Sequence, residues 1–285
     1  MAIERDLDVG DGRTVRFWDT GQTGAGDLTV VWHQGTPQTG QLLAPVVAAA
    51  AERGIRVVSC ARAGYPGTTP LPGRTVADGA ADVVAVAAAL GLESYAPVGA
   101  SGGGPHALAC AALDPEHVAV VVTMAGIAPY TRDFDWLAGM AAPGALASAL
   151  QEGRDGRRRY AETEEFDESS FVDTDWAALQ GTWGPLGADA NRAAEEARAG
   201  GGVPWGEIDD DVAYVDDWGF ELAAVACPTL IVQGGRDRVV PRAHGEWLVE
   251  HLPAAQFWLR PNDGHIAVLN ALPVALDWVL DTVGS

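Results

Sequence analysis

The stretch Gly99-Ala100-Ser101-Gly102-Gly103 directly follows the apolar run 95–98 and opens the alanine-rich segment 102–113. A G-x-S-x-G sequence between a strand and a helix forms a sharp turn that lifts the serine hydroxyl above the sheet. Glycines flank the serine because the turn crowds its neighbours and strains the serine backbone. With 35 glycines and seven serines in 285 residues, chance supplies only about 0.1 such matches. Ser101 is therefore a candidate nucleophile; a glycine-rich phosphate-binding turn or a plain helix start is the alternative.

Apolar strands alternate with helical segments on both sides of this turn. The predicted strands are 28–32, 55–59, 95–99, 118–124, 229–233 and 256–259. The predicted helices are 41–52, 78–90, 102–113, 242–251 and 266–283. Two alternating segments, 3–9 and 14–18, predict a hairpin around Gly10-Asp11-Gly12. Nearly continuous apolar strands between helices predict an α/β fold with a mostly parallel central sheet and helices on both faces.

The alternation stops in the middle of the chain. Residues 129–220 contain short helical patches among glycine, proline and acidic clusters, with no strong strand. The sequence therefore predicts a core made of 1–128 and 221–285, interrupted by a helical cap, or lid, at 129–220.

His265 is the best candidate for the base that a serine nucleophile needs. It lies in Asn262-Asp263-Gly264-His265, a loop after the last predicted strand. The chain order nucleophile, acid, base places the base there. A polar cap on the following helix is the other interpretation of this histidine.

Asp237 is the candidate for the acid that orients this histidine. It lies in Gly234-Gly235-Arg236-Asp237, directly after the predicted strand 229–233 and thus at the carboxyl edge of the sheet. The loop after the strand ending near Met124 offers no carboxylate before Asp133. Asp263 is the remaining competitor, but only two residues separate it from His265, so it should point away or cap the helix.

A third loop predicts the oxyanion hole. His33-Gln34-Gly35-Thr36-Pro37 follows the first predicted core strand, where one backbone N–H donor is usually found; the other is that of Gly102, directly after the serine. Either Gln34 or Thr36 could supply this second donor, beside Gly102, and we favour the N–H of Thr36. A plain turn forced by Gly35 and Pro37 is the alternative.

Together the hairpin, the Gly-Ala-Ser-Gly-Gly turn, Gly-Arg-Asp-Arg-Val-Val-Pro (235–241) and Asp-Gly-His (263–265) resemble the α/β-hydrolase family in type, order and spacing, over essentially the whole chain. The resemblance implies a triad of Ser101, His265 and Asp237, with a lid at 129–220. A serine nucleophile argues against the epoxide hydrolases and haloalkane dehalogenases of this fold, which use aspartate. Prolyl-type peptidases usually carry His-Gly-Gly-Pro-Gly and a tryptophan after the serine, whereas this chain has Gln-Gly-Thr-Pro-Gln and Ser-Gly-Gly.

Composition excludes several functions. The net charge is −21 and no lysine occurs, which argues against nucleic acid and membrane surfaces as partners and excludes Schiff-base chemistry. No metal-ligand spacing and no cofactor motif is present, so we expect neither metal nor cofactor. Three scattered cysteines and no apolar leader or spanning run indicate a cytoplasmic protein. A small-molecule substrate is expected as the partner, and a homo-oligomer stays open.

The predicted lid carries much of the charge. Residues 129–220 hold twenty acidic residues against seven arginines, and five tryptophans. Most of these acids should form a solvated face, yet such a lid should favour neutral, apolar or cationic substrates. The sequence thus predicts a serine hydrolase of carboxylic esters or lactones. A prolyl-type aminopeptidase or amidase with the same triad is the alternative, and a non-catalytic small-molecule binder is a third reading.

Overall fold

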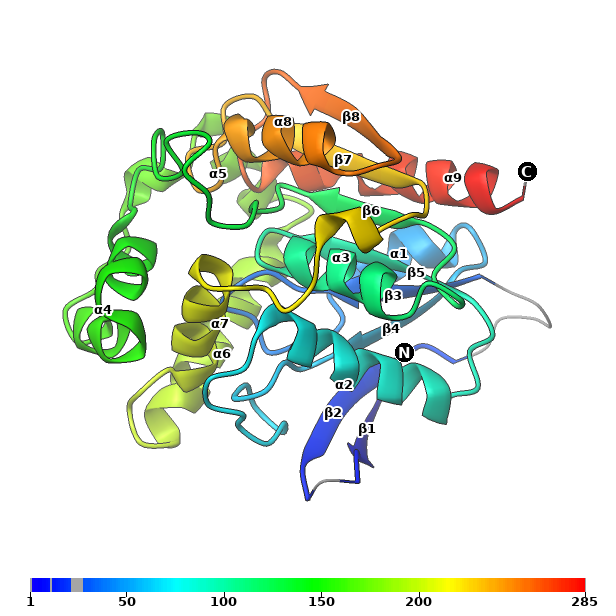
Figure 1. Ribbon diagram of the computed structural model, residues 1–285, viewed down its shortest axis with the longest axis horizontal. Helices are drawn as coiled ribbons and strands as arrows, with labels where there is room; N and C mark the ends of the chain where they lie inside the picture. The colour runs from blue at the N-terminus through cyan, green and yellow to red at the C-terminus, as the bar shows by residue number, and fades with distance from the viewer. Residues whose placement is uncertain (1, 11, 22–27, 285) are drawn as a thin grey trace.

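The computed structural model describes residues 2–10, 12–21 and 28–284. Within these residues one sheet has the strand order β1-β2-β4-β3-β5-β6-β7-β8 (Figure 1). Its strands are β1 (Ile3–Asp8), β2 (Thr14–Asp19), β3 (Thr29–His33), β4 (Arg56–Cys60), β5 (Tyr95–Ala100), β6 (Val121–Met124), β7 (Thr229–Gly234) and β8 (Ala255–Arg260). β2 pairs antiparallel with β1 and β4, and the other neighbours are parallel. The predicted mostly parallel sheet is confirmed; Asp11, in the predicted hairpin turn, lies outside the described residues.

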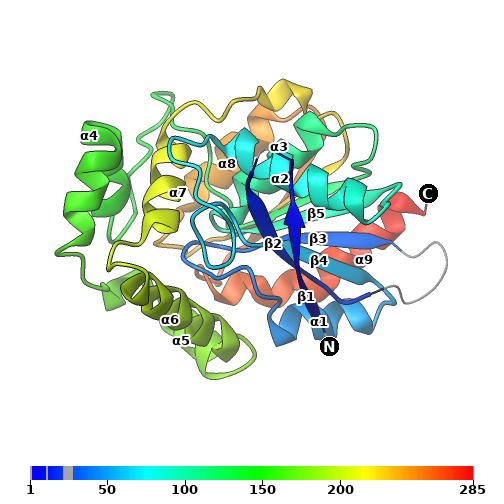
Figure 2. The same cartoon turned by 90° about the horizontal axis from the view of Figure 1, so that it is seen from below.

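Helices cover both faces of the sheet because its central strands are buried on both sides. In β3, Val30 and Trp32 belong to the core that includes α1 (Ala44–Ala51) and α9 (Leu272–Val283). Val31 belongs to the opposite core, which includes α2 (Val76–Ala89), α3 (Gly103–Leu113) and α8 (Arg242–His251). Figure 2 shows the two groups of helices on either side of the strands. This division follows from the two-residue period of a strand.

Local chemistry explains where helix boundaries differ from those predicted. α2 begins at Val76 rather than residue 78, because Thr75 and Asp78 form a capping box. The predicted helix 266–283 is divided into a 3-10 turn, Ala267–Ala271, and α9. Pro273 lies in the first turn of α9, where its missing N–H costs nothing, and it would break a helix that continued from residue 266.

Four helices lie between β6 and β7 in the chain: α4 (Gly144–Ala161), α5 (Asp173–Gln180), α6 (Gly184–Ala199) and α7 (Trp205–Val215). Figure 1 shows them gathered at one side of the sheet. α4 is not straight, because Gly153 has φ 60° and ψ −150° and joins two helical pieces. No strand occurs among the described residues of this stretch, in agreement with the sequence pattern.

Candidate active site

Ser101 sits in the sharp turn between β5 and α3. Its φ is 52°, in the left-handed region that few non-glycine residues adopt. The turn needs its flanking glycines: a Cβ at Gly99 would lie 2.3 Å from the carbonyl oxygen of Gly103, and a Cβ at Gly103 would lie 2.1 Å from that of His33. The crowding that we expected from the sequence is therefore present on both sides of the serine.

The structure brings together the three side chains that the sequence singled out. His265 Nε2 lies 2.9 Å from Ser101 Oγ, and His265 Nδ1 lies 2.8 Å from Asp237 Oδ2. Asp237 follows β7 and His265 follows β8, so both side chains come from loops at the carboxyl ends of strands. With Nδ1–H donating to the carboxylate, Nε2 is free to accept the serine proton.

Asp237 is fixed in place by its own loop. Its Oδ1 accepts hydrogen bonds from the backbone N–H groups of Val239 and Val240, each at 2.9 Å. Asp263, the competing acid, points elsewhere: its Oδ2 accepts a 2.7 Å bond from Arg260 Nε. Of these two acids, Asp237 is the one hydrogen-bonded to His265.

The surroundings of His265 favour its charged form. Burial alone would lower the pKa of His265. The charge of Asp237, the hydrogen bond that His265 donates to that carboxylate and the charge of Asp175 outweigh burial, so the pKa is raised above the ordinary histidine value. Asp175 belongs to α5, is fully buried, and accepts bonds of 2.7 and 2.8 Å from the N–H groups of Ile266 and Ala267. It therefore holds the loop that carries His265.

The predicted oxyanion loop lies directly against the serine turn. A Cβ on Gly35 would lie 3.3 Å from Ser101 Cβ, and one on Gly102 would lie 2.8 Å from Thr36 Oγ1. Among the described residues, no protein acceptor takes the backbone N–H of Thr36 or Gly102. The side chain of Gln34 is held by Cys60, since its Nε2 donates to Cys60 O at 2.9 Å. The geometry is compatible with Thr36 as the second donor.

A cavity of about 680 Å³ opens at Ser101 and His265. Its apolar lining comes from the sheet loops and from the helices between β6 and β7, and it includes Trp32, Ile127, Leu146, Phe166, Phe171 and Trp176. Five ionisable side chains other than His265 and Tyr214 also line it: Arg157, Glu164, Glu207, Asp211 and Arg238.

Three of these carboxylates share one arginine. Arg157 is fully buried and forms ion pairs of 2.9 Å with Glu164, 2.9 Å with Glu207 and 2.6 Å with Asp211. Burial and the neighbouring negative charges raise the pKa of Glu207 to about 8. Burial likewise raises the pKa of Asp211, to about 6, although Arg157 opposes it. We call Arg157, Glu164, Glu207 and Asp211 the Arg157 group. Its three carboxyl groups outnumber its single guanidinium group.

Five of the twenty acids of 129–220 do not belong to the solvated face that we expected for most of them. Asp175, Asp189, Asp209, Asp210 and Asp211 are buried. Three of them hold loops at the candidate site: Asp175 the His265 loop, Asp189 the N–H and hydroxyl of Thr39 at 3.0 and 2.7 Å, and Asp210 the hydroxyl of Thr36 at 2.7 Å. The run of three acids at 209–211 was a candidate signal, because consecutive helical residues point about 100° apart and three of them cover more than half of the helix circumference.

Comparison with known proteins places the fold. A family model described as alpha/beta hydrolase fold matches residues 29–272, so the chain belongs to the α/β-hydrolase fold family, as the resemblance implied. Mouse Serine hydrolase BPHL is 43% identical over 44 residues, which is 15% of this chain and 15% of that protein. A bromoperoxidase from Bacillus anthracis has a TM-score of 0.71 at 21% identity, covering 99% of this chain and 100% of that one. An esterase from Exiguobacterium antarcticum has a TM-score of 0.69 at 18% identity, with the same coverage. The family supports a hydrolase, and the two solved structures, both below 25% identity, show the same fold.

Two features are absent from the residues that the structure describes. None of their helices combines the length and apolar character that crossing a membrane requires. Within the same residues, no group of three or more histidine, cysteine or acidic side chains is arranged to hold a metal ion.

Proposed function

We propose that this protein is a serine hydrolase that cleaves carboxylic esters or lactones through an acyl-enzyme. The observation that carries the proposal is the continuous set of hydrogen bonds from Asp237 through His265 to Ser101, at 2.8 and 2.9 Å, beside a cavity large enough for a small substrate. Family membership alone would support only a hydrolase, because one fold hosts many chemistries.

In the proposed mechanism His265 accepts and returns the proton in both halves of the reaction. Ser101 Oγ attacks the carbonyl carbon while His265 Nε2 takes the hydroxyl proton, and the N–H groups of Thr36 and Gly102 stabilise the resulting oxyanion. His265 then gives the proton to the alcohol oxygen as the C–O bond breaks, leaving the acyl group on Ser101. A water molecule attacks this ester with His265 again taking the proton. Collapse returns the proton to Ser101 and releases the acid.

The role of His265 predicts a pH profile. Only the neutral imidazole can take the serine proton, so kcat/KM should rise as pH rises through the pKa of His265 in the free enzyme. Because that pKa is raised, the midpoint of the acid limb should lie above 6.5. In Asp237→Asn the residual activity should have its midpoint at lower pH, since the charge that raises the pKa is gone. A wild-type midpoint well below 6.5 would contradict the proposed environment of His265.

Two measurements test the proposal directly. A fluorophosphonate probe should label the wild type at Ser101, located by peptide mapping, and should not label Ser101→Ala. A panel of p-nitrophenyl esters, lactones and aminoacyl-anilides would then identify the bond that is cleaved. A chain that bound panel compounds but neither reacted with the probe nor hydrolysed any of them would be the non-catalytic binder instead.

A second candidate function is a prolyl-type aminopeptidase or amidase, and the Arg157 group favours it. Glu207 and Asp211 line the same cavity as Ser101, where they could hold a substrate ammonium. Arg238 also lines the cavity but is exposed, so solvent screens its opposing charge. We propose that residues 129–220 cover the cavity and that this group sets its preference for neutral or cationic substrates.

An ester pair tests this preference. An ester bearing a quaternary ammonium group should gain in kcat/KM over its neutral tert-butyl analogue as pH rises from 6 to 9, because Glu207 and Asp211 lose their protons over that range. The ratio cancels the titration of His265, which both esters share. Glu207→Gln should reduce the ratio about tenfold at high pH, the loss of one charge-assisted contact. Glu152→Gln, at an exposed acid of α4, is the matched control and should leave the ratio unchanged. A pH-independent ratio near one would rule out the Arg157 group as a cation site.

A further inference from the structure

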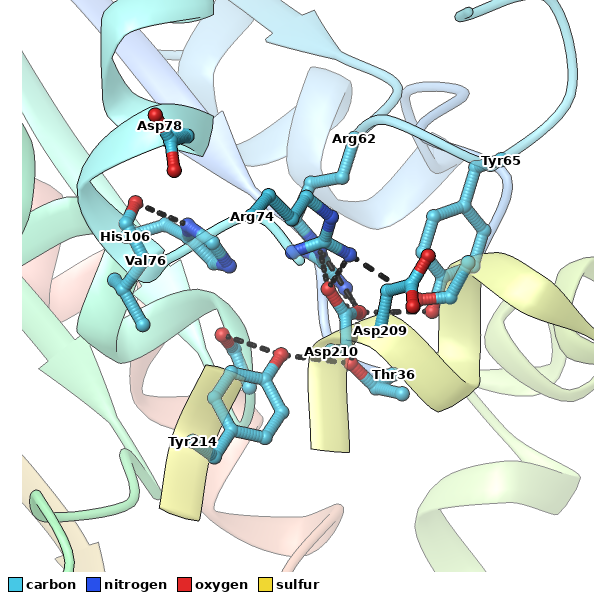
Figure 3. A network of polar contacts seen from close by, with 12 residues as sticks. Thr36, Arg62, Tyr65, Arg74, Val76, Asp78, His106, Asp209, Asp210 and Tyr214 are labelled. Carbon is cyan, nitrogen blue, oxygen red and sulfur yellow. Dashed lines mark hydrogen bonds and ion pairs between the residues drawn. The ribbon is translucent and has the colours of Figure 1, made fainter. Parts of the chain in front are cut away.

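Asp210 of α7 is the centre of a buried polar network that the mechanism has not used (Figure 3). Its side chain is fully buried. It accepts hydrogen bonds from the Thr36 hydroxyl at 2.7 Å, the Tyr65 hydroxyl at 2.8 Å and Arg62 Nη2 at 2.6 Å, and a further short one from Arg74. Burial would raise the pKa of this carboxyl, but the two guanidinium groups hold it far below its usual range. An ionised carboxylate is therefore fixed between the sheet and α7.

Arg62 connects Asp210 to the oxyanion loop. Its Nη1 donates to the carbonyl oxygen of Gln34 at 2.6 Å, and its Nη2 donates to that of Gly35 at 3.1 Å and to Thr36 Oγ1 at 2.9 Å. The planar guanidinium thus holds three consecutive residues of the loop in one geometry. Asp210 fixes both the guanidinium and the Thr36 hydroxyl, so the loop is held from two directions.

Tyr214 connects the oxyanion loop to the serine turn. It stands one helical turn after Asp210 on α7, and its hydroxyl lies 2.9 Å from Thr36 Oγ1 and 3.0 Å from the carbonyl oxygen of Gly102. Since the Thr36 proton goes to Asp210, the Tyr214 proton is available for Gly102 or for the Thr36 oxygen. Tyr214 and Gly102 are packed closely, because a Cβ on Gly102 would lie 2.3 Å from the Tyr214 hydroxyl.

We infer that Asp210 and Tyr214 are positioning residues for the oxyanion hole: from one helix of the 129–220 segment they fix the spacing of Thr36 and Gly102, the two residues whose N–H groups bind the oxyanion. The inference rests on the proposed function. On this view the segment is part of the catalytic apparatus as well as a cover, because α7 sets the geometry of donors that belong to the sheet loops.

The expected signature is kinetic. Oxyanion donors act on charge that develops only in the transition state, so displacing them lowers kcat and leaves KM nearly unchanged. A brace that only stabilised the fold would lower the midpoint of thermal unfolding and leave kcat of the folded enzyme intact.

Two tyrosine-to-phenylalanine variants separate these roles. Tyr214→Phe removes the hydroxyl that contacts Thr36 and Gly102. Tyr65→Phe removes a hydroxyl from the same carboxylate, Asp210, but that hydroxyl contacts neither residue. We expect Tyr214→Phe to lower kcat on a p-nitrophenyl ester and the rate of fluorophosphonate labelling by about tenfold, less than the full loss of a donor, with KM within about twofold. Tyr65→Phe should keep both rates within about twofold of wild type.

A second pair keeps the test independent of how Tyr214→Phe folds. Thr36→Val removes the hydroxyl that Asp210, Arg62 and Tyr214 hold, and should lower kcat by about tenfold or more. Thr36→Ser retains that hydroxyl and should recover most of the rate. Equal labelling and turnover rates for Tyr214→Phe and Tyr65→Phe, or for the two Thr36 variants, would overturn the inference alone. A wild type that the probe does not label and that hydrolyses no ester would overturn the proposed function and this inference with it.

Discussion

Ser101→Ala is expected to remove nearly all turnover while the protein stays folded. Within the described part of the chain the hydroxyl makes one hydrogen bond, to His265, so the free energy of unfolding should change by no more than about 1 kcal/mol. Alanine keeps a Cβ, so the backbone strain at φ 52° is unchanged. Residual hydrolysis should still exceed the uncatalysed rate by about 10³-fold, because the oxyanion donors and the cavity survive.

The control for this variant is a serine beside the same strand. Ser94 lies exposed just before the amino end of β5, whereas Ser101 follows its carboxyl end. Ser94→Ala should therefore retain wild-type kcat and probe labelling. Steady-state kinetics on a p-nitrophenyl ester and thermal unfolding of both variants provide the comparison. Turnover of Ser101→Ala close to that of the wild type would refute the nucleophile assignment and the acyl-enzyme mechanism together.

The sequence predicted the candidate triad because each member has a local signal. Ser101 lies in a glycine-flanked turn, and Asp237 and His265 each follow an apolar run by a few residues. Parallel strands end at one edge of the sheet, so residues after β5, β7 and β8 are brought together by the fold itself. The α/β core and its two-sided helical cover were predictable for the same reason, since burial on both faces leaves continuous apolar strands.

The buried acids of the 129–220 segment that hold the loops at the site could not be predicted from such local signals. Asp210 is 148 residues from Arg62 in the chain, and its role depends on how α7 packs on the loop after β3. In the sequence it is one of twenty acids in a segment without strands. The structure gives the acids of 209–211 different arginines: Arg154 for Asp209, Arg62 and Arg74 for Asp210, and Arg157 for Asp211. Which arginine meets which acid is set by tertiary packing, which neither periodicity nor composition encodes.

Asp237→Asn should lower kcat by about 10⁴-fold without displacing His265. The N–H groups of Val239 and Val240 both point at Oδ1 of Asp237, so an asparagine would turn its carbonyl oxygen toward them. Its amide NH₂ would then face His265 Nδ1, which could no longer donate and would have to accept. The imidazole proton would move to Nε2, facing Ser101, and the base would be lost.

Asp263→Asn separates this tautomer effect from a general loss of negative charge near His265. The substitution removes the same charge two residues from His265, but the carboxylate that it changes is paired with half-buried Arg260. A partly exposed pair of this kind contributes about 0–1 kcal/mol to the free energy of unfolding, and kcat should stay within about threefold of wild type. Steady-state kinetics with a saturating ester, together with NMR of the imidazole protons, would report both the rate and the tautomer. If Asp263→Asn lost several thousandfold in kcat while Asp237→Asn lost little, the acid would have to be Asp263, and the 2.8 Å contact between Asp237 and His265 would have no catalytic role.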